Sequence, residues 1–468
     1  MLLGRTAEIT ALEESYTSER NTLTILYGRS SIGKTALIRQ FIQDKNCFYY
    51  SAVQASDKEQ KALFQNEMKR QGLLTNQEQK DIQEKAQNES EMFSYQVMLK
   101  EIMNMDSSVK LIVIEEFQNI IKNNKEFMSV IAEMMKDTYN NAHVMIICTS
   151  SSISWIENSM VSAIGSNALA ITAFIKLKEL SFVDTVRMFP NYSVPDSMIV
   201  YAITGGVPGY MRQFSEKLSI KENICQNILT QGKLLNRAGS EFVKEELRET
   251  SLYNTILYCI AGGEYKLNEL HAHTGFGRDK ISVYLKNLIE REIVDKIFSY
   301  DIGGKEYTKK GLYRIKSAYT EFWFRYIYGN ESALAMMNPE EFYDTYISDS
   351  IDAFAAETFI KVGTEFIELL NTMGKLEIKI DRRGRWWGKN GNIDMIACDE
   401  NDHYVVGKCN WMTDVFTFSM FEELMYQVNL AGIGKDYIYL FSKETFDEEL
   451  KSFAAENTNV KLISLNDL

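Results

Sequence analysis

The sequence predicts an α/β protein whose first 180 residues form three layers, with a parallel sheet between helices. Across residues 1–180, short apolar runs typical of buried strands alternate with amphipathic stretches typical of helices. One of these apolar runs leads directly into a glycine-rich loop, and a helix follows that loop at once. The chain has 468 residues, which is too many for one hydrophobic core, so two to four domains are expected.

The composition narrows the class of protein. Hydrophobic residues make up 45% and charged residues 25%, which is ordinary for a soluble globular protein. The N-terminus lacks a secretory pattern and no apolar stretch approaches about 18 residues, so no membrane association is expected. Six scattered cysteines without a CxxC pair indicate a reducing, cytoplasmic setting with neither zinc nor disulfides. The net charge of −13 argues against a surface that coats nucleic acid, but local basic patches remain possible.

Residues 23–43 carry the clearest functional signal, because they read LTILYGRSSIGKTALIRQFIQ. The apolar run 23–27 should be a buried parallel strand, and the loop after it matches GxxxxGK(S/T) in full. Loop amides and the helix N-terminus would wrap phosphates, Lys34 would reach the β- and γ-phosphates, and the Thr35 hydroxyl would hold Mg²⁺. We expect ATP or ADP with Mg²⁺ here; the alternative is a glycine-rich turn without a ligand. The expected contacts are Gly28, Arg29, Ser30, Ser31, Ile32, Gly33, Lys34, Thr35 and Ala36.

Two further strands should end near this loop. Residues 109–120 read VKLIVIEEFQNI, an apolar strand that ends in Glu115 and Glu116. In P-loop ATPases such a strand supplies one carboxylate that helps to hold Mg²⁺ and another that polarises the attacking water. We therefore expect Glu115 at the metal and Glu116 as the catalytic base, with an ordinary strand end as the alternative. A third strand, 142–152, ends in hydroxyl residues, and Ser150 joins Glu116 and Lys34 as a catalytic candidate unless it belongs to a plain turn.

Residues 246–335 contain three amphipathic stretches followed by a hairpin pattern, which predicts a winged helix-turn-helix. In DNA-binding examples the third helix enters the major groove and the wing contacts phosphates. Acidic residues offset part of the positive charge of this region. Binding of double-stranded DNA and a structural or protein-docking role therefore both stay open. Candidate DNA contacts are Arg278, Lys280, Ser282 and Lys286 on the third helix, and Lys305, Lys309 and Lys310 on the wing.

Five segments in this order resemble the archaeal-type ATPase family, which comprises AAA+/STAND-related P-loop proteins. They are LLGRTAEITALEESY, the glycine-rich loop, IVIEEFQ, CTSSSIS and GGVPGYM. The resemblance implies that Gly4, Arg5 and Glu8 lie beside the adenine pocket. It also implies a helical lid over residues 181–245 that contains Gly206 and Pro208. The chain departs from the family where it reads GSNALAITA, without the arginine usual there. If that arginine stabilises charge during hydrolysis, turnover should be slow.

Residues 336–468 resemble the family's C-terminal restriction-endonuclease-like (PD-(D/E)XK) domain. Asp394 is in place as a metal ligand, and Glu357 is an outer candidate. The resemblance places an acid and a lysine where this chain has Lys408 and Asn410. Repulsion between Lys408 and Mg²⁺ at about 4–5 Å would amount to several kcal/mol. We therefore expect a catalytically degenerate site in which Lys408 pairs with Asp394. The alternatives are an active nuclease, or phosphate-backbone binding by Arg382, Arg383, Arg385 and Lys389, which otherwise form a solvated loop.

Together these features predict an ATP-binding protein, a slow ATP hydrolase whose nucleotide state controls contact with DNA or a protein partner. The alternative is an ATP-gated switch or scaffold that binds a protein and does not hydrolyse ATP.

Overall fold

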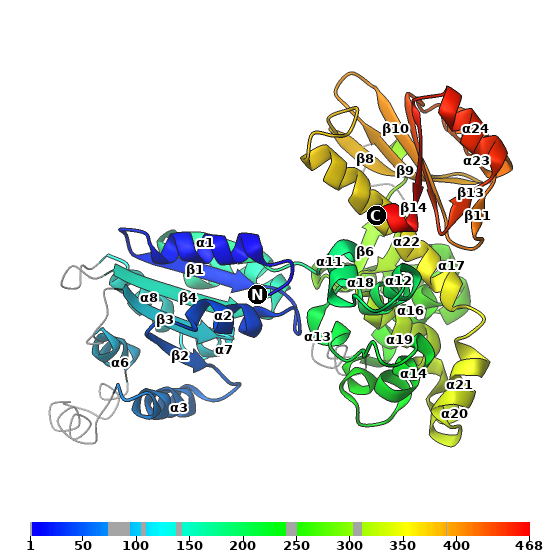
Figure 1. Cartoon of the computed structure of the whole chain (residues 1–468). Coiled ribbons are helices and arrows are strands. Elements are labelled where there is room, and N and C mark those ends of the chain that lie inside the picture. Colours follow the sequence, from blue (N-terminus) through cyan, green and yellow to red (C-terminus); the bar gives the residue numbers. More distant parts are fainter. Residues whose placement is uncertain are drawn as a thin grey trace. The chain divides into compact units, whose positions relative to one another are not determined.

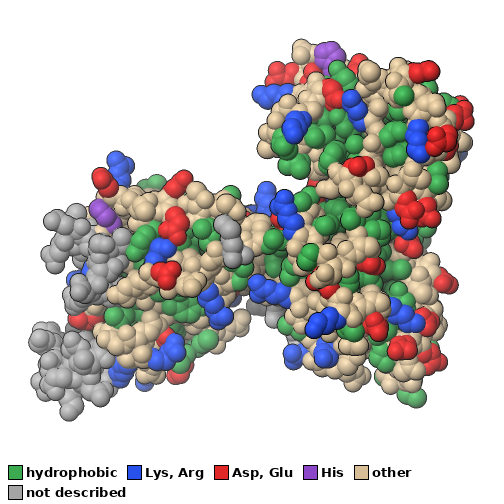
Figure 2. All heavy atoms as spheres, viewed as in Figure 1, with side chains coloured by type: hydrophobic (Ala, Val, Ile, Leu, Met, Phe, Trp, Pro, Cys, Tyr) green, Lys and Arg blue, Asp and Glu red, His purple; other side chains and the backbone are tan. Residues whose placement is uncertain are grey.

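The computed structural model describes residues 2–73, 94–103, 109–136, 143–239, 250–302, 311–389 and 391–468. It divides into two compact units, Met1–Glu179 and Leu180–Leu468, which are described in turn (Figure 1). None of the helices in this described part combines the length and apolar character needed to cross a membrane. On the face shown in Figure 2, acidic and basic side chains are interspersed.

The first unit is built on a five-stranded sheet in the order β2-β3-β4-β1-β5. All four neighbouring pairs run parallel, which confirms the predicted parallel sheet. Its strands are β1 (Thr22–Tyr27), β2 (Cys47–Ser51), β3 (Val109–Glu115), β4 (His143–Ser150) and β5 (Ala173–Lys176). Because β4 lies between β1 and β3, the carboxyl ends of these three strands meet at one edge.

Helices cover both faces of this sheet, because apolar residues occupy successive positions along its strands. In β3, Leu111 and Val113 belong to one buried cluster, whereas Ile112 and Ile114 belong to another. The first cluster includes side chains of α1 (Thr6–Tyr16) and α2 (Lys34–Ile42). The second includes those of α3 (Asp57–Arg70), α6 (Tyr95–Ile102), α7 (Gln118–Ile121) and α8 (Glu126–Met134). Strand residues buried on both sides are the pattern expected for parallel sheets, and they give the three layers.

The second unit begins with helices. In chain order they are α11 (Phe182–Met188), α12 (Val194–Thr204), α13 (Pro208–Met211) and α14 (Ile220–Asn223). Next come α16 (Thr250–Ala261), α17 (Leu267–Thr274) and α18 (Arg278–Glu290), and then the antiparallel strands β6 (Val294–Ile297) and β7 (Leu312–Ile315). Ile281, Leu285 and Leu288 of α18 are fully buried, as the helical spacing predicts. The wing candidates Lys305, Lys309 and Lys310 lie outside the described residues.

The helix α19 (Ala318–Tyr326) carries buried aromatic side chains, which agrees with a packing role for this segment. Two short helices follow, α20 (Glu331–Met336) and α21 (Pro339–Tyr346). Phe322 of α19 packs edge-on against Phe354 at 5.7 Å between ring centroids. Both rings belong to one large buried cluster that extends into the C-terminal sheet.

The C-terminal part is a second α/β layer structure with sheet order β14-β12-β10-β9-β8. β10 (Tyr404–Asn410) runs antiparallel to β9 (Asn392–Cys398) and parallel to β12 (Tyr437–Ser442), so the sheet is mixed. β8 (Arg382–Trp387) and β14 (Val460–Ser464) are its edge strands. The long helix α22 (Ile351–Thr372) packs on β9 and β10. A separate buried cluster joins the sheet to α23 (Phe418–Ala431) and α24 (Glu448–Glu456), near the short pair β11 (Val415–Phe416) and β13 (Thr445–Phe446).

Candidate functional site

The loop between β1 and α2 has the backbone that a phosphate cradle requires. Gly28 has φ +156°, and a Cβ there would lie 2.7 Å from the Leu177 carbonyl oxygen. Ser31 and Gly33 also have positive φ values, of +65° and +103°. Gly33 precedes the first residue of α2, so the loop delivers its amides to the N-terminus of that helix. Glycine is needed at position 28 because no other residue fits so close to the neighbouring backbone.

Lys34 reaches back over this loop. Its Nζ donates to the carbonyl oxygens of Gly28 at 2.7 Å and Arg29 at 3.1 Å. Burial lowers the pKa of Lys34, while the charges of Glu116 and Glu115 oppose that shift. The ammonium group, held at the Gly28 and Arg29 carbonyls, is thus within electrostatic range of both predicted carboxylates.

Glu115, the predicted metal ligand, is the last residue of β3. Its side chain is buried, and its Oε2 accepts a 2.5 Å hydrogen bond from the Tyr49 hydroxyl. Burial and this carboxylate raise the pKa of Tyr49, so the hydroxyl keeps its proton and remains a donor. Glu115 Oε1 is buried without a hydrogen-bond partner among the described residues. A buried carboxylate oxygen is normally satisfied, so this atom is suited to a cation.

Glu116 adopts a left-handed backbone conformation with φ +52°. This conformation is uncommon for a residue with a side chain and costs about 1–3 kcal/mol where it is strained. It turns the chain at the strand end, and Glu116 Oε2 accepts hydrogen bonds from the Ser151 amide at 3.1 Å and the Ser151 hydroxyl at 2.6 Å. The Gln118 side-chain amide donates a third, at 2.6 Å. Strands β3 and β4 thus bring together two residues that the sequence pattern did not connect.

Ser150 is fully buried between β1 and its own loop. Its carbonyl accepts from the Gly28 amide at 3.2 Å, and its hydroxyl oxygen accepts from the Ser152 amide at 3.1 Å. Its neighbour Ser151 is the serine that contacts Glu116. The catalytic role of Ser150 stays a prediction, whereas Ser151 and Tyr49 are contacts that the sequence alone did not reveal. Only the register of the parallel strands, with Ser51 beside Glu115 and Ile114 beside Cys148, brings them near the two acids.

Arg5 is a buried residue whose hydrogen bonds hold the loop between β1 and α2. Its guanidinium donates to the carbonyl oxygens of Ile32 at 3.1 Å and Lys178 at 2.7 Å, and it pairs with Glu8 at 3.2 Å. These bonds tie the end of the loop to the segment after β5. The predicted lid residue Pro208 begins α13 in the second unit, and its nucleotide contact stays a prediction.

The residues present fit a nucleotide with Mg²⁺. Thr35 is half-buried in the first turn of α2, and Glu115 offers an unpaired carboxylate oxygen. Oxygen ligands of this kind are what Mg²⁺ prefers. Lys34 and the loop amides supply the positive charge that a triphosphate needs.

The second predicted site lies in the C-terminal sheet. Lys408 Nζ lies 3.6 Å from Asp394 Oδ2, so the expected ion pair is present. Asp394 also accepts hydrogen bonds from the Asn392 side chain at 2.6 Å and the Cys409 amide at 3.0 Å. Asn410 is occupied elsewhere, because its amide donates to the carbonyl oxygens of Thr413 and Val415. Glu357 of α22 accepts a hydrogen bond from Arg385 at 3.2 Å and pairs with Arg314 at 3.7 Å.

The exposed side of α18 carries the remaining predicted contacts. Arg278 donates to the Asn268 side chain at 2.9 Å, and Lys280 lies 5.0 Å from the Phe276 ring centroid. Lys286 is highly exposed and lies 3.8 Å from Glu290. The Ser282 hydroxyl bonds its own helix at the Arg278 carbonyl.

Comparison with known proteins gives two family matches. Residues 2–214 match the model of an ATPase domain found predominantly in Archaea. Residues 323–425 match a model of archaeal and bacterial proteins of unknown function.

Two relatives from Methanocaldococcus jannaschii align with the chain. The uncharacterized protein MJECL04 is 28% identical over 442 residues, which cover 93% of this chain and 94% of that protein. The uncharacterized ATP-binding protein MJ0423 is 40% identical over 45 residues, which cover 10% of this chain and 76% of the relative.

Two solved structures are also similar. The Walker-type ATPase PABY2304 of Pyrococcus abyssi is 16% identical, with a TM-score of 0.48, and the match covers 69% of this chain and 96% of that one. The ORC2 protein of Aeropyrum pernix, in ADPNP and ADP complexes, is 13% identical with a TM-score of 0.43, over 72% of this chain and 95% of that one. Residues 2–214 therefore carry an ATPase domain of this predominantly archaeal kind, in agreement with the geometry of the loop between β1 and α2.

Proposed function

We propose that this protein binds and slowly hydrolyses ATP, and that its nucleotide state controls how the second unit contacts DNA or a protein partner. The observation that carries the proposal is the meeting of Lys34, Glu115 and Glu116 at one edge of the sheet. The ATPase family match and the ATP-binding relative support the choice of ATP.

Each of these residues has a distinct role in the proposed reaction. Thr35 and Glu115 would hold Mg²⁺, which neutralises phosphate charge when bound. Lys34 leaves the Gly28 and Arg29 carbonyls to bind the β- and γ-phosphates. Glu116 accepts a proton from the attacking water, a role that contributes about 10²–10⁴-fold to rate.

The same contacts account for slow turnover. Glu116 Oε2 accepts three hydrogen bonds from Ser151 and Gln118, so activation of water falls to Oε1 or requires these bonds to rearrange. Glu115 is longer by one methylene than the Asp usual at its position, which shifts the metal-binding oxygen. The hydrogen bonds that Glu116 Oε2 accepts also favour the second candidate function, an ATP-gated switch that does not hydrolyse its ligand.

Phosphate release from the full chain with ATP and Mg²⁺ separates these two candidates. We expect Glu116→Gln to reduce the rate at least about 100-fold while ATP binding is retained. Glu133→Gln, which changes an exposed acid of α8, is the matched control and should leave the rate unchanged. Background release from the wild type that equals the release from Glu116→Gln, with ATP still bound, would establish the switch.

For the second unit, we propose that α16 to α18 and the hairpin β6–β7 form the predicted winged helix. The division into 181–245, 246–335 and 336–468 is part of this proposal. Its support is the element order of three helices followed by an antiparallel pair, with basic side chains on the exposed side of α18.

We propose further that the C-terminal sheet is a nuclease-like domain without nuclease activity. The support is that Lys408 places a cation 3.6 Å from Asp394, where a metal ion would be needed. Asn410 stands where the resemblance places the water-orienting lysine. Its side-chain amide is bonded to its own turn, so it does not take over that role. The restriction-endonuclease likeness itself remains part of the proposal.

A further inference from the structure

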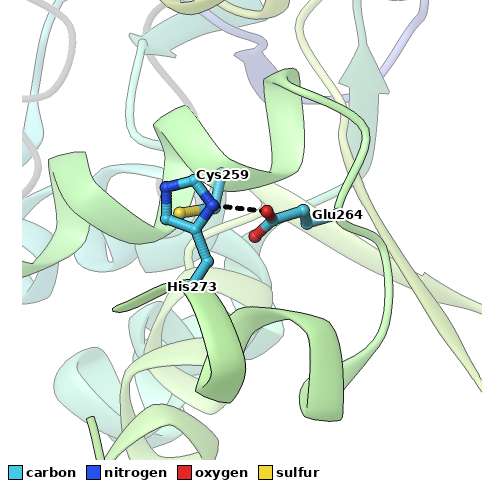
Figure 3. Close-up of side chains that lie close together, drawn as sticks. All are labelled: Cys259, Glu264 and His273. Carbon is cyan, nitrogen blue, oxygen red and sulfur yellow. Dashed lines mark hydrogen bonds and ion pairs between the residues drawn. The ribbon is translucent and has the colours of Figure 1, made fainter. Parts of the chain in front are cut away.

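A cysteine, a glutamate and a histidine meet where α16 and α17 turn back on each other (Figure 3). Cys259 lies in the last turn of α16, Glu264 in the connection and His273 in the last turn of α17. The turn returns the chain to Cys259, because the Glu264 amide donates to the Cys259 carbonyl at 3.0 Å. Gly263, with φ +105°, permits this reversal.

The three side chains offer their ligand atoms to one point. The Cys259 Sγ, a Glu264 carboxylate oxygen and a His273 ring nitrogen all lie within 4.8 Å of one another. His273 Nδ1 and Glu264 Oε1 are 2.5 Å apart, as the dashed line in Figure 3 marks. Glu264 Oε2 is buried and has no hydrogen-bond partner among the described residues. The Cys259 thiol is the donor nearest to this carboxylate, and a cation bound in place of the thiol proton would satisfy the buried oxygen.

We infer that Cys259, Glu264 and His273 bind one divalent transition-metal ion of the Zn²⁺ type, with a fourth position open to water. Zn²⁺ takes thiolate, imidazole and carboxylate ligands in a tetrahedral arrangement, whereas Mg²⁺ and Ca²⁺ prefer oxygen alone. The thiol side is dry, since Cys259 is 2% exposed. The His273 side chain is 52% exposed, which gives the ion access from solvent.

Binding at this site exchanges protons for the metal. The metal ligand is the Cys259 thiolate and not the thiol, and its Sγ lies within 4.8 Å of the Glu264 carboxylate oxygen and the His273 ring nitrogen. The ion must therefore displace the thiol proton to solvent and replace the hydrogen bond between His273 and Glu264. Metal affinity should then rise with pH.

The inference does not depend on ATP hydrolysis or DNA binding. Its elements are the first two helices of the proposed winged helix, so a bound ion would link α16 to α17 ahead of α18. His271, two residues from His273, serves as a natural comparison because its Nδ1 is already 2.7 Å from the Phe276 carbonyl.

Titration of the full chain with Co²⁺ tests the ligand set by absorbance. Thiolate coordination gives a sulfur-to-cobalt charge-transfer band in the near ultraviolet, and Co²⁺ at the nucleotide loop would lack it, since that loop offers oxygen ligands. We expect one such band per chain, its loss on adding Zn²⁺, and its absence in Cys259→Ser. Cys225→Ser, which changes a buried thiol elsewhere in the second unit, should keep the band.

Zn²⁺ affinity, measured by competition with a chromogenic chelator, provides the second measurement. His273→Ala changes a largely exposed side chain and should weaken binding at least about tenfold, whereas His271→Ala should not. Circular dichroism of each variant checks that it is folded. A wild-type chain that gives no charge-transfer band, or equal Zn²⁺ affinities in wild type and His273→Ala, would overturn the site and show that His273 and Glu264 form only a hydrogen bond.

Discussion

Asp394 is a buried carboxylate that forms an ion pair with Lys408. Burial raises the pKa of Asp394, while the Lys408 charge and the Cys409 amide oppose the rise. Because this acid has a higher pKa folded than unfolded, its charged form opposes folding. The destabilisation is absent below the unfolded pKa and complete above the folded pKa, so stability falls as pH rises between them. Lys408 stabilises the carboxylate and so keeps the folded pKa of Asp394 closer to its unfolded pKa.

Removing Lys408 should therefore destabilise the protein at neutral pH. We expect Lys408→Met to lower the free energy of unfolding by about 1–3 kcal/mol at pH 7, because a buried charge loses its partner. The difference from wild type should shrink as the pH falls and Asp394 takes up a proton. Urea unfolding of the two proteins across pH 4–8 measures it, with Lys451→Met as a control for an exposed pair.

The double variant Asp394→Asn/Lys408→Met should recover most of this loss, since neither charge then remains. A loss that is independent of pH would show that Lys408 acts through packing instead.

The wild-type protein, incubated with plasmid DNA and Mg²⁺ or Mn²⁺, should leave the plasmid uncut. Cleavage that disappears in Asp394→Ala would contradict the proposed loss of nuclease activity.

At the scale of elements, strand order explains which site residues were predictable. The loop motif of residues 28–35 is contiguous, so its phosphate-binding chemistry can be predicted without a structure. Ser151 was missed because it reaches Glu116 only through the pairing of β3 with β4. The Cys259, Glu264 and His273 cluster was missed for the same reason: two helices must fold back before it exists. Strand and helix types follow from apolar spacing, whereas contacts between elements depend on register and packing.

The basic side of α18 leads to a prediction at this same scale. If α18 contacts DNA phosphates, Lys280→Gln/Lys286→Gln should weaken binding to double-stranded DNA and reduce the salt slope by about two. Binding measured by fluorescence anisotropy across a salt series gives both quantities. Lys435→Gln/Lys451→Gln, which removes the same charge from exposed positions of the C-terminal part, is the matched control.

Loss of affinity in both double variants would indicate that net charge, and not α18, governs binding. No measurable binding by the wild type at low salt would favour a protein partner for this surface. The sequence left open whether α18 contacts DNA or a protein partner, and the salt series decides between the two.

At the scale of the whole molecule, two compact units allow nucleotide binding and its consequence to be measured separately. A ligand at 100 times its Kd stabilises the unit that binds it by about 2.7 kcal/mol. Units that unfold independently give separate calorimetric transitions. We expect ATP with Mg²⁺ to raise the transition of the first unit, and Lys34→Ala to abolish that shift while leaving the fold intact.

The transition of the second unit then tests the proposed coupling. If nucleotide state controls the second unit, the two units must share free energy of interaction, and ATP must alter the second transition as well. A non-hydrolysable analogue removes turnover from the comparison, so any shift reports binding alone. Calorimetry of wild type and Lys34→Ala, each with and without the analogue, gives the four curves required. A first transition that moves while the second stays fixed would show that the ATPase unit binds its ligand alone, and the regulatory part of the proposal would fail while ATP binding stood.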